Sequence, residues 1–530
     1  MSGVAAGGRR AWRASWAPRL PFVVGGLVTG IALAAITPVP VGVFWDDGVY
    51  LIGAKALASG AGYRFAHLPG APPAVHFPPG YSALLALVWK LSPPFPSNVS
   101  VLKLVNPLLL GLAAALAAAW GVRRLALPPL VAAAAAIVFS ASLPLLVVTG
   151  VLFSEPLFLV ALFAALLLAD RAAEYGGNGA AVLAGAAAGA AVLVRTAGLA
   201  LLPALVVGLL ISRRRREAVI AGATVVATIA PWQLWLATHV SALAPPLRGS
   251  YGPYLDWVLA LYRQRGARFA LTVMRENVLA LFRTAGIALF PYGPREPRPL
   301  LVALVIVAAV VAMVSARRRA PTAALFLGCY LALVLAWPYA PDRFLWAVWP
   351  LVGMQVASGV VVCWRLGATA GARPGARASV SLACAVSVIA LAGHVAYSVR
   401  GVARHWWDLA ARTNAAALTP VVSWITAHTA PGDVVACDGE PFVHLYTGRT
   451  VVPVHILSPD EYLAGTPIEL AAEDLRTLFV ANRPRYAVFS AAAAGEQRAA
   501  LLLDGANGTP RLVPLDTLPG GGAAFRVVFP

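Results

Sequence analysis

The residues best suited to chemistry are two adjacent carboxylates, Asp46 and Asp47, which directly follow the uncharged apolar run Leu20–Trp45. An ionised carboxylate at the edge of hydrocarbon is costly unless water, a cation or a substrate lies nearby. Two adjacent carboxylates also repel each other and raise each other's pKa. The pair is suited to accepting a proton or orienting a cation, and its alternative role is that of a solvated pair at a membrane interface.

The composition indicates that this pair belongs to a multi-span membrane protein. Of the 530 residues, 60% are hydrophobic and only 12% are charged, which excludes a simple soluble enzyme. Long apolar stretches predict about 11 membrane helices. The stretches are Leu20–Trp45, Leu104–Val122, Leu125–Ser154, Pro156–Ala169, Gly176–Val194, Thr196–Ser212, Ala218–Thr238, Pro299–Ala316, Ala320–Pro338, Phe344–Trp364 and Ala378–Val399.

The net charge of +19 comes from arginines in short loops between these stretches, a pattern that sets membrane topology rather than binding nucleic acid. Arg9, Arg10, Arg13 and Arg19 precede the first stretch and predict a cytoplasmic N-terminus. Counting onward places every basic cluster in the cytoplasm: Arg123–Arg124, Arg213–Arg216, Arg317–Arg319 and Arg365–Arg377. The expected location is the inner (plasma) membrane, with a retained first helix.

The same count places four regions on the outer side: the loop Asp46–Lys103, the corner Ser154–Pro156, the segment Val240–Arg298 and everything after Arg400. Within the loop, Pro79–Leu91 is too short for a span and predicts a juxtamembrane helix. An interfacial helix is expected within Val240–Arg298.

Residues 1–400 are therefore predicted to form a transmembrane domain, and residues 401–530 a small extracytoplasmic α/β domain. Helices are expected at Ala415–His428 and Ile468–Asn482, and strands at Val434–Cys437, Thr450–Val454, Arg485–Phe489 and Phe525–Phe529. Asp438, Glu440 and His444 are metal-ligand types, but their place after a strand favours helix caps, and no metal site is predicted.

The outer loops carry motifs that resemble the glycosyltransferase C (GT-C) superfamily over most of the chain. The loop after the first stretch reads W-D-D-G-x-Y from Trp45, then A-x-x-L-x-x-G-x-G-Y ending at Tyr63, then F-P-P-G-Y ending at Tyr81. Ser154–Leu157 is similar to an S-E-P-L corner, and Pro341–Phe344 to a late Arg-aromatic motif. The pattern is similar to the lipid A aminoarabinose transferase and protein O-mannosyltransferase families.

The resemblance implies inverting transfer of a sugar from a polyprenyl-phosphate donor to an extracytoplasmic lipid, glycan or protein. It implies a catalytic role for Asp46 or Asp47, which rank equally, and for Glu155, whose alternative role is to favour a helix N-terminus. Adjacent carboxylates permit a divalent cation but do not require one. The residues expected to bind the donor phosphate are Arg343, Arg195, Lys55 and His76, and those of the substrate loop are Tyr50, Tyr63, Pro78, Pro79 and Tyr81.

Other interpretations remain open. The arginines could contact lipid headgroups, His76 could be a solvated loop residue, and Asp342 is expected to hold Arg343 in place if Arg343 binds phosphate. For the whole chain, the alternatives are a transporter or flippase of lipid-linked sugars and a noncatalytic scaffold. The carboxylates gather at one membrane face and no internal repeat is evident, which favours one-sided chemistry.

Overall fold

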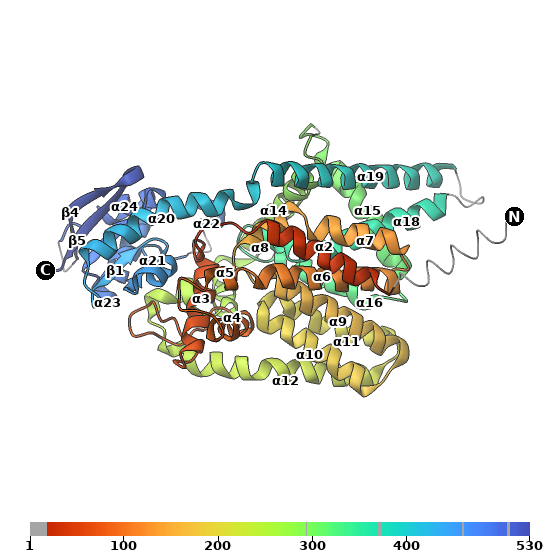
Figure 1. Cartoon of the computed structure of the whole chain (residues 1–530), viewed down its shortest axis with the longest axis horizontal. Coiled ribbons are helices and arrows are strands. Elements are labelled where there is room, and N and C mark those ends of the chain that lie inside the picture. Colours follow the sequence, from red (N-terminus) through yellow and green to blue (C-terminus); the bar gives the residue numbers. More distant parts are fainter. Residues whose placement is uncertain (1–17, 293, 368–373, 458–460, 506–508) are drawn as a thin grey trace.

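A bundle of apolar helices carries a small sheet-containing unit at one end in the computed structural model, which describes residues 18–292, 294–367, 374–457, 461–505 and 509–530 (Figure 1). Arg9, Arg10 and Arg13, on which the topology prediction partly depends, lie outside the described residues. The helices of the bundle are α2 (Leu20–Ala34), α6 (Val105–Arg124), α7 (Pro129–Ser140), α8 (Leu143–Gly150), α9 (Glu155–Tyr175), α10 (Asn178–Val194), α11 (Leu201–Ile211), α12 (Arg215–His239), α15 (Arg298–Ala316), α16 (Pro321–Leu335), α18 (Trp349–Gly367) and α19 (Pro374–Ala403).

Apolar helices coincide with all of the predicted stretches. In the described part of the chain, 6 helices are long and apolar enough to cross a membrane, and the bent pair α7 and α8 brings the candidates to 7. Four further apolar segments are shorter than this: α2, α10, Thr196–Ile211 and α16. The predicted number of about 11 membrane helices therefore stays a prediction.

Some predicted stretches are broken or shorter in the structure. Thr196–Ser212 begins with the 3-10 helix Thr196–Ala200, and Phe344–Trp364 is divided between Asp342–Trp346 and α18. The others are Leu20–Trp45 and Leu125–Ser154. The first was expected to reach Trp45, but α2 ends at Ala34, since Pro38 and Pro40 follow and proline cannot donate a helical hydrogen bond. The stretch Leu125–Ser154 was expected to be one helix, but it bends by 53° between α7 and α8, and Pro144 is the second residue of α8.

Shorter helices lie where the bundle meets the sheet-containing unit. They are α3 (Trp45–Ala58), α4 (Gly80–Lys90), α5 (Val99–Leu102), α13 (Arg248–Tyr251) and α17 (Asp342–Trp346). The helix α4 confirms the one predicted over Pro79–Leu91. The segment Val240–Arg298 contains the long helix α14 (Tyr254–Leu289), which kinks at Gly266, where φ is 74°. Asn277 of α14 donates hydrogen bonds to three carbonyls at the end of α16.

The C-terminal domain runs from α20 to β5. Its elements are α20 (Leu409–His428), β1 (Val434–Cys437), α21 (Glu440–Thr447), β2 (Thr450–Val452), α22 (Glu461–Ala464), α23 (Ile468–Asn482), β3 (Tyr486–Phe489), α24 (Ala494–Ala500), β4 (Arg511–Leu518) and β5 (Gly522–Val528). The sheet has the order β2-β1-β3-β5-β4, in which β2, β1 and β3 are parallel and β5 and β4 are antiparallel. The helix start expected after the first strand corresponds to α21, whereas α22, α24 and β4 were not predicted.

Candidate active site

Asp46 and Asp47 both lie in the first turn of α3, but they face different surroundings. Asp47 is completely buried, and its carboxylate accepts hydrogen bonds from the backbone N–H groups of Gly42 at 2.7 Å and Phe44 at 2.8 Å. The side chain of Asp46 remains 27% exposed. Asp47 therefore fixes the chain that enters α3, whereas Asp46 is partly accessible to solvent.

Burial dominates the protonation of Asp47. It raises the pKa of this carboxyl to about 7, against the lowering effect of the two backbone donors, and the neighbouring charge of Asp46 raises it further. A group that is buried and engaged in this way is poorly placed to reach an acceptor hydroxyl.

Arg343 bridges two carboxylates that lie far away in the sequence. Its Nε is 2.5 Å from Oε1 of Glu155, and its Nη1 forms an ion pair with Asp46. The guanidinium also lies over the ring of Phe153, 3.6 Å from the ring centroid. Burial acts to lower the pKa of Arg343, but Glu155 and Asp46 outweigh it, so that pKa is raised and the guanidinium stays charged.

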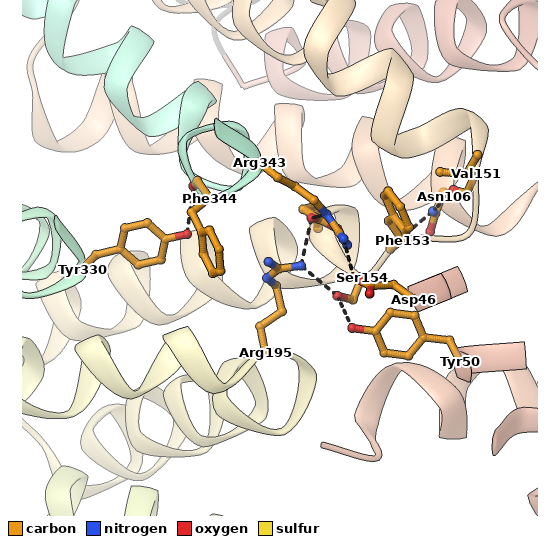
Figure 2. Close-up of polar contacts among 11 residues, drawn as sticks. Asp46, Tyr50, Asn106, Val151, Phe153, Ser154, Arg195, Tyr330, Arg343 and Phe344 are labelled. Carbon is orange, nitrogen blue, oxygen red and sulfur yellow. Dashed lines mark hydrogen bonds and ion pairs between the residues drawn. The ribbon is translucent and has the colours of Figure 1, made fainter. Parts of the chain in front are cut away.

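Arg195 contacts the same buried carboxylate from the other side. Its Nη1 is 2.9 Å from Oε1 of Glu155 and donates a hydrogen bond to Ser154 Oγ at 3.2 Å. Figure 2 shows Arg195 and Arg343 converging beside Ser154 and Asp46. The four charges form a chain, Arg195–Glu155–Arg343–Asp46, that is neutral as a whole. We call these four residues the charged cluster.

The corner before α9 positions Glu155. Asn106 of α6 donates hydrogen bonds to the carbonyls of Val151 and Phe153, both at 3.0 Å. The hydroxyl of Tyr81 in turn donates to Asn106 at 2.9 Å. Tyr81, a predicted substrate-loop residue, is completely buried and therefore supports the corner instead of facing the cluster.

The remaining substrate-loop residues pack together at the base of the cluster. The hydroxyls of Tyr50 and Ser154 are 3.1 Å apart, and the ring of Tyr50 stacks on Phe77 at 4.6 Å. Tyr63 donates to the carbonyl of Phe77 at 3.0 Å. Pro78 is buried, and Pro79 is the residue that precedes α4. Tyr50 reaches the charged cluster through Ser154, whose hydroxyl also accepts a hydrogen bond from Arg195.

His76 is buried beside the cluster but is unsuited to binding phosphate as a cation. Its Nδ1 lies 2.8 Å from the carbonyl of Gly252, and its ring packs against Trp45 and Tyr254. Burial lowers the pKa of His76 to about 4, so the imidazole is neutral near pH 7.

Lys55 and Asp342 also have partners that differ from those expected. Lys55 is half-buried near His444 of the C-terminal domain; burial lowers the pKa of that histidine, and the charge of Lys55 lowers it further. Asp342 accepts a hydrogen bond from Thr284 of α14, so it is Asp46 and Glu155, rather than Asp342, that hold Arg343. Sequence adjacency was misleading because the first turn of α17 points these neighbours in different directions.

Two buried residues near the cluster were missed or misassigned from the sequence. Nζ of Lys103 donates to the carbonyls of Thr37 at 2.6 Å and Val39 at 2.5 Å, and it holds the segment between α2 and α3 that leads to Asp47. Glu440, expected to be a helix cap, instead accepts hydrogen bonds from Trp45 and Tyr251. In the sequence, Lys103 and Glu440 stand out as charged residues beside apolar ones, and this was the only signal of their burial.

No group of three or more histidine, cysteine, aspartate or glutamate side chains that could hold a metal ion occurs among the described residues. Asp46 and Asp47 diverge toward Arg343 and the backbone of residues 42–44, so the two carboxylates do not converge on one point. Asp438 binds the backbone N–H of Ser490 at 2.8 Å and its hydroxyl, and His444 Nδ1 lies 2.9 Å from the carbonyl of Arg449.

The chain matches solved structures but no known sequence family. No protein-family model and no curated protein matches the chain. The chain is similar to the crystal structure of ArnT from Cupriavidus metallidurans bound to undecaprenyl phosphate, with a TM-score of 0.53 and 14% identity over 96% of this chain and 97% of that chain.

Two further matches have lower TM-scores. They are the apo oligosaccharyltransferase of Archaeoglobus fulgidus (TM-score 0.47, 13% identity, 91% of this chain and 71% of that chain) and the arabinofuranosyltransferase AftD from Mycobacteria (TM-score 0.41, 16% identity, 96% of this chain and 40% of that chain).

The match to ArnT covers nearly the whole of both chains and therefore concerns the overall architecture, from the apolar bundle to the C-terminal domain. The apolar helices and this neighbour together indicate an integral membrane protein. The chain has the fold of the GT-C glycosyltransferases.

Proposed function

We propose that this protein is a membrane glycosyltransferase that moves a sugar from a polyprenyl-phosphate donor to an extracytoplasmic lipid, glycan or protein. The observation that carries the proposal is the charged cluster, in which a partly exposed carboxylate and two arginines meet at one end of an apolar bundle. The fold is also that of a protein whose crystal structure contains undecaprenyl phosphate.

Asp46 is the proposed general base. It is 27% exposed and lies in the first turn of α3, where an acceptor hydroxyl can approach it. Asp47 is assigned a supporting role, because its buried oxygens already accept two backbone hydrogen bonds. Proton removal by a positioned carboxylate contributes on the order of 10²-fold to 10⁴-fold to a rate.

Arg343 and Arg195 are the proposed partners of the donor phosphate. A guanidinium can bind two phosphate oxygens with two parallel hydrogen bonds, and Arg343 is 29% exposed on the same side as Asp46. Glu155 is completely buried between the two arginines and is proposed to orient both, without contacting the reacting atoms.

In the proposed displacement, the acceptor oxygen forms a bond to the anomeric carbon while the bond from that carbon to the phosphate oxygen breaks. The acceptor proton moves to Asp46, and the electron pair of the broken bond stays on the polyprenyl phosphate. The departing phosphate thereby gains one negative charge, which Arg343 is placed to stabilise. A single displacement inverts the configuration at the anomeric carbon.

The proposed topology keeps the N-terminus in the cytoplasm and places the 46–103 loop, the charged cluster and the C-terminal domain on the outer side of the inner membrane. Support comes from the end of the bundle far from the cluster, where Arg124 pairs with Glu174 and Arg214 donates to the carbonyls of Ala173 and Glu174. Basic residues thus gather at one end, as the positive-inside rule expects of a cytoplasmic face.

The function can be tested with purified protein in lipid nanodiscs, a panel of polyprenyl-phosphate sugars and membrane-extract acceptors. The variants are Asp46→Asn and, as a matched control, Glu473→Gln, which changes an exposed carboxylate of α23. We expect transfer by the wild type and the control and a loss of about 100-fold or more in Asp46→Asn.

Equal transfer by Asp46→Asn and wild type would contradict the role of the base. Transbilayer movement of the sugar lipid without formation of a glycosidic bond would instead identify a flippase.

A further inference from the structure

A carboxylate of the C-terminal domain reaches the residue next to the proposed base. Glu440 is the first residue of α21, and it is buried with 4% of its surface exposed. Its Oε1 accepts a hydrogen bond from the indole Nε1 of Trp45 at 2.9 Å and another from the hydroxyl of Tyr251 at 2.6 Å. Trp45 directly precedes Asp46, so this contact joins the C-terminal domain to the start of α3.

The two helices are also in close steric contact. A Cβ built on Gly48 of α3 would lie 2.6 Å from Cβ of Pro441, and one built on Gly42 would lie 2.9 Å from Cδ1 of Leu445. Real Cβ atoms do not approach that closely, so α21 packs against the bare backbone on both sides of Asp47. The hydrogen bond of Glu440 is thus one part of a closely packed contact.

Tyr251 extends this contact to a third segment. Its hydroxyl donates to Glu440, which leaves its oxygen to accept from Nε2 of His67, 2.8 Å away. The ring of Trp45 packs against Tyr251 at 5.2 Å. Residues from the 46–103 loop, from α13 and from α21 therefore surround the indole and fix its orientation.

We infer that Glu440 is a positioning residue for glycosyl transfer: through Trp45 it sets the orientation of the first turn of α3, and so holds Asp46 against Arg343. This inference rests on the proposed function of Asp46. It makes the C-terminal domain part of the active site. Glu440 itself does not contact the reacting atoms, because its bonded oxygen is buried behind the indole.

The alternative, that Glu440 only stabilises the folded domain, predicts different behaviour in three variants. Glu440→Ala removes both hydrogen bonds, Glu440→Gln keeps an oxygen that can accept both, and Trp45→Phe keeps the aromatic ring but lacks the donor. Because Trp45→Phe retains most of the packing, it remains informative even if Glu440→Ala fails to fold. Glu473→Ala, on the exposed face of α23, is the control.

The experiment measures kcat and KM for the donor in nanodiscs, together with the thermal unfolding midpoint. We expect Glu440→Ala and Trp45→Phe each to lower kcat by about 10-fold to 100-fold with little change in KM, because the base is displaced while the phosphate site is kept. Glu440→Gln should recover most of the lost kcat. The double variant Glu440→Ala/Trp45→Phe should be no slower than the slower single variant, since both act through one contact.

Several results would overturn the inference: kcat unchanged in Glu440→Ala, kcat as low in Glu440→Gln as in Glu440→Ala, or losses that multiply in the double variant. Failure of the proposed function is a separate observation, namely that wild type shows no transfer or that Asp46→Asn is fully active. In that event, hydrogen exchange of the amides of residues 42–48 still tests the positioning. Faster exchange in Glu440→Ala but not in Glu440→Gln supports it, and equal exchange contradicts it.

Discussion

Neighbouring carboxylates in the first turn of α3 have opposite surroundings, and this difference separates the proposed base from a supporting residue. Successive residues on a helix point about 100° apart. That rotation turns Asp47 into the protein, toward the N–H groups of Gly42 and Phe44, and leaves Asp46 beside Arg343. Asp47 could take the place of Asp46 only if α3 were rotated about its axis.

Asp47 predicts a pH dependence of stability. Its pKa is raised from 3.8 to about 7 in the folded protein. Between these values only the folded state holds the proton, so the contribution of Asp47 to stability is complete below pH 3.8, falls as the pH rises toward 7 and then levels off. The midpoint of thermal unfolding, measured from pH 4 to 8, should fall more steeply for wild type than for Asp47→Asn, which cannot titrate. Parallel curves would contradict a buried, titrating Asp47.

Arg343 predicts a difference between two cations. Arg343→Lys keeps the charge but cannot reach Glu155, Asp46 and a phosphate with one planar group, so we expect kcat/KM to fall by roughly 10-fold or more. Arg275→Lys changes an exposed arginine of α14 paired with Glu276 and should have no effect. Full activity of Arg343→Lys would show that charge alone is sufficient at this position.

At this scale the sequence indicated which residues carry charge in the outer loops, but not how they pair. Arg343 lies 297 positions from Asp46 and 188 from Glu155, and no local pattern encodes such a contact. The sequence does contain a signal that favours Asp46 over Asp47 as the base. An aspartate at the third position of a helix commonly accepts a hydrogen bond from the N–H of the residue before the helix, as Asp47 does from Phe44.

Side chains of α21 pack closely against the glycine backbone at α3, and this contact predicts the effect of a single methyl group. Gly48→Ala improves helix propensity by about 1 kcal/mol but places Cβ against Pro441, so we expect a lower unfolding midpoint and a displaced C-terminal domain. Gly328→Ala in α16, where no atom lies within 4 Å of the added Cβ, should be neutral or stabilising. Equal midpoints for the two variants would mean that α3 and α21 are less tightly packed.

Element positions were largely predictable because apolar length and proline placement are local properties. The strand Val434–Cys437 has the predicted bounds, and α23 has the predicted Ile468–Asn482. The strand β4 was missed because its side chains are mostly exposed and Pro514 interrupts it, which removes the alternating pattern of a typical strand. The contact of α21 with α3 was missed because it depends on tertiary packing.

The whole molecule is elongated, with the C-terminal domain at one end of the bundle (Figure 1). The first described helix, α2, lies among the helices of the bundle. The proposed topology places Gly432 outside the cell and Gly179 in the cytoplasm. Both glycines are exposed with open space around an added Cβ. The native Cys363, Cys384 and Cys437 are buried, and Cys329, which is half-buried in α16, is replaced by alanine in both variants. In intact cells a membrane-impermeant thiol reagent should label Gly432→Cys and not Gly179→Cys.

Permeabilised cells should give labelling of both variants, which controls for reactivity. Labelling of Gly179→Cys alone in intact cells would reverse the topology. The sequence could predict this orientation only from its arginine loops, because the position of a membrane is not encoded in any single residue.

The neutrality of the charged cluster has a consequence for selectivity in a bilayer crowded with phospholipid headgroups. An exposed, unpaired arginine would attract any of these abundant phosphates, and the site would be blocked most of the time. Arg343 is instead already paired with Asp46 and Glu155, so an incoming phosphate must compete with two carboxylates. We expect common anionic lipids to be weak inhibitors of transfer, since the ion pairs that their phosphate must replace are already formed in the resting site.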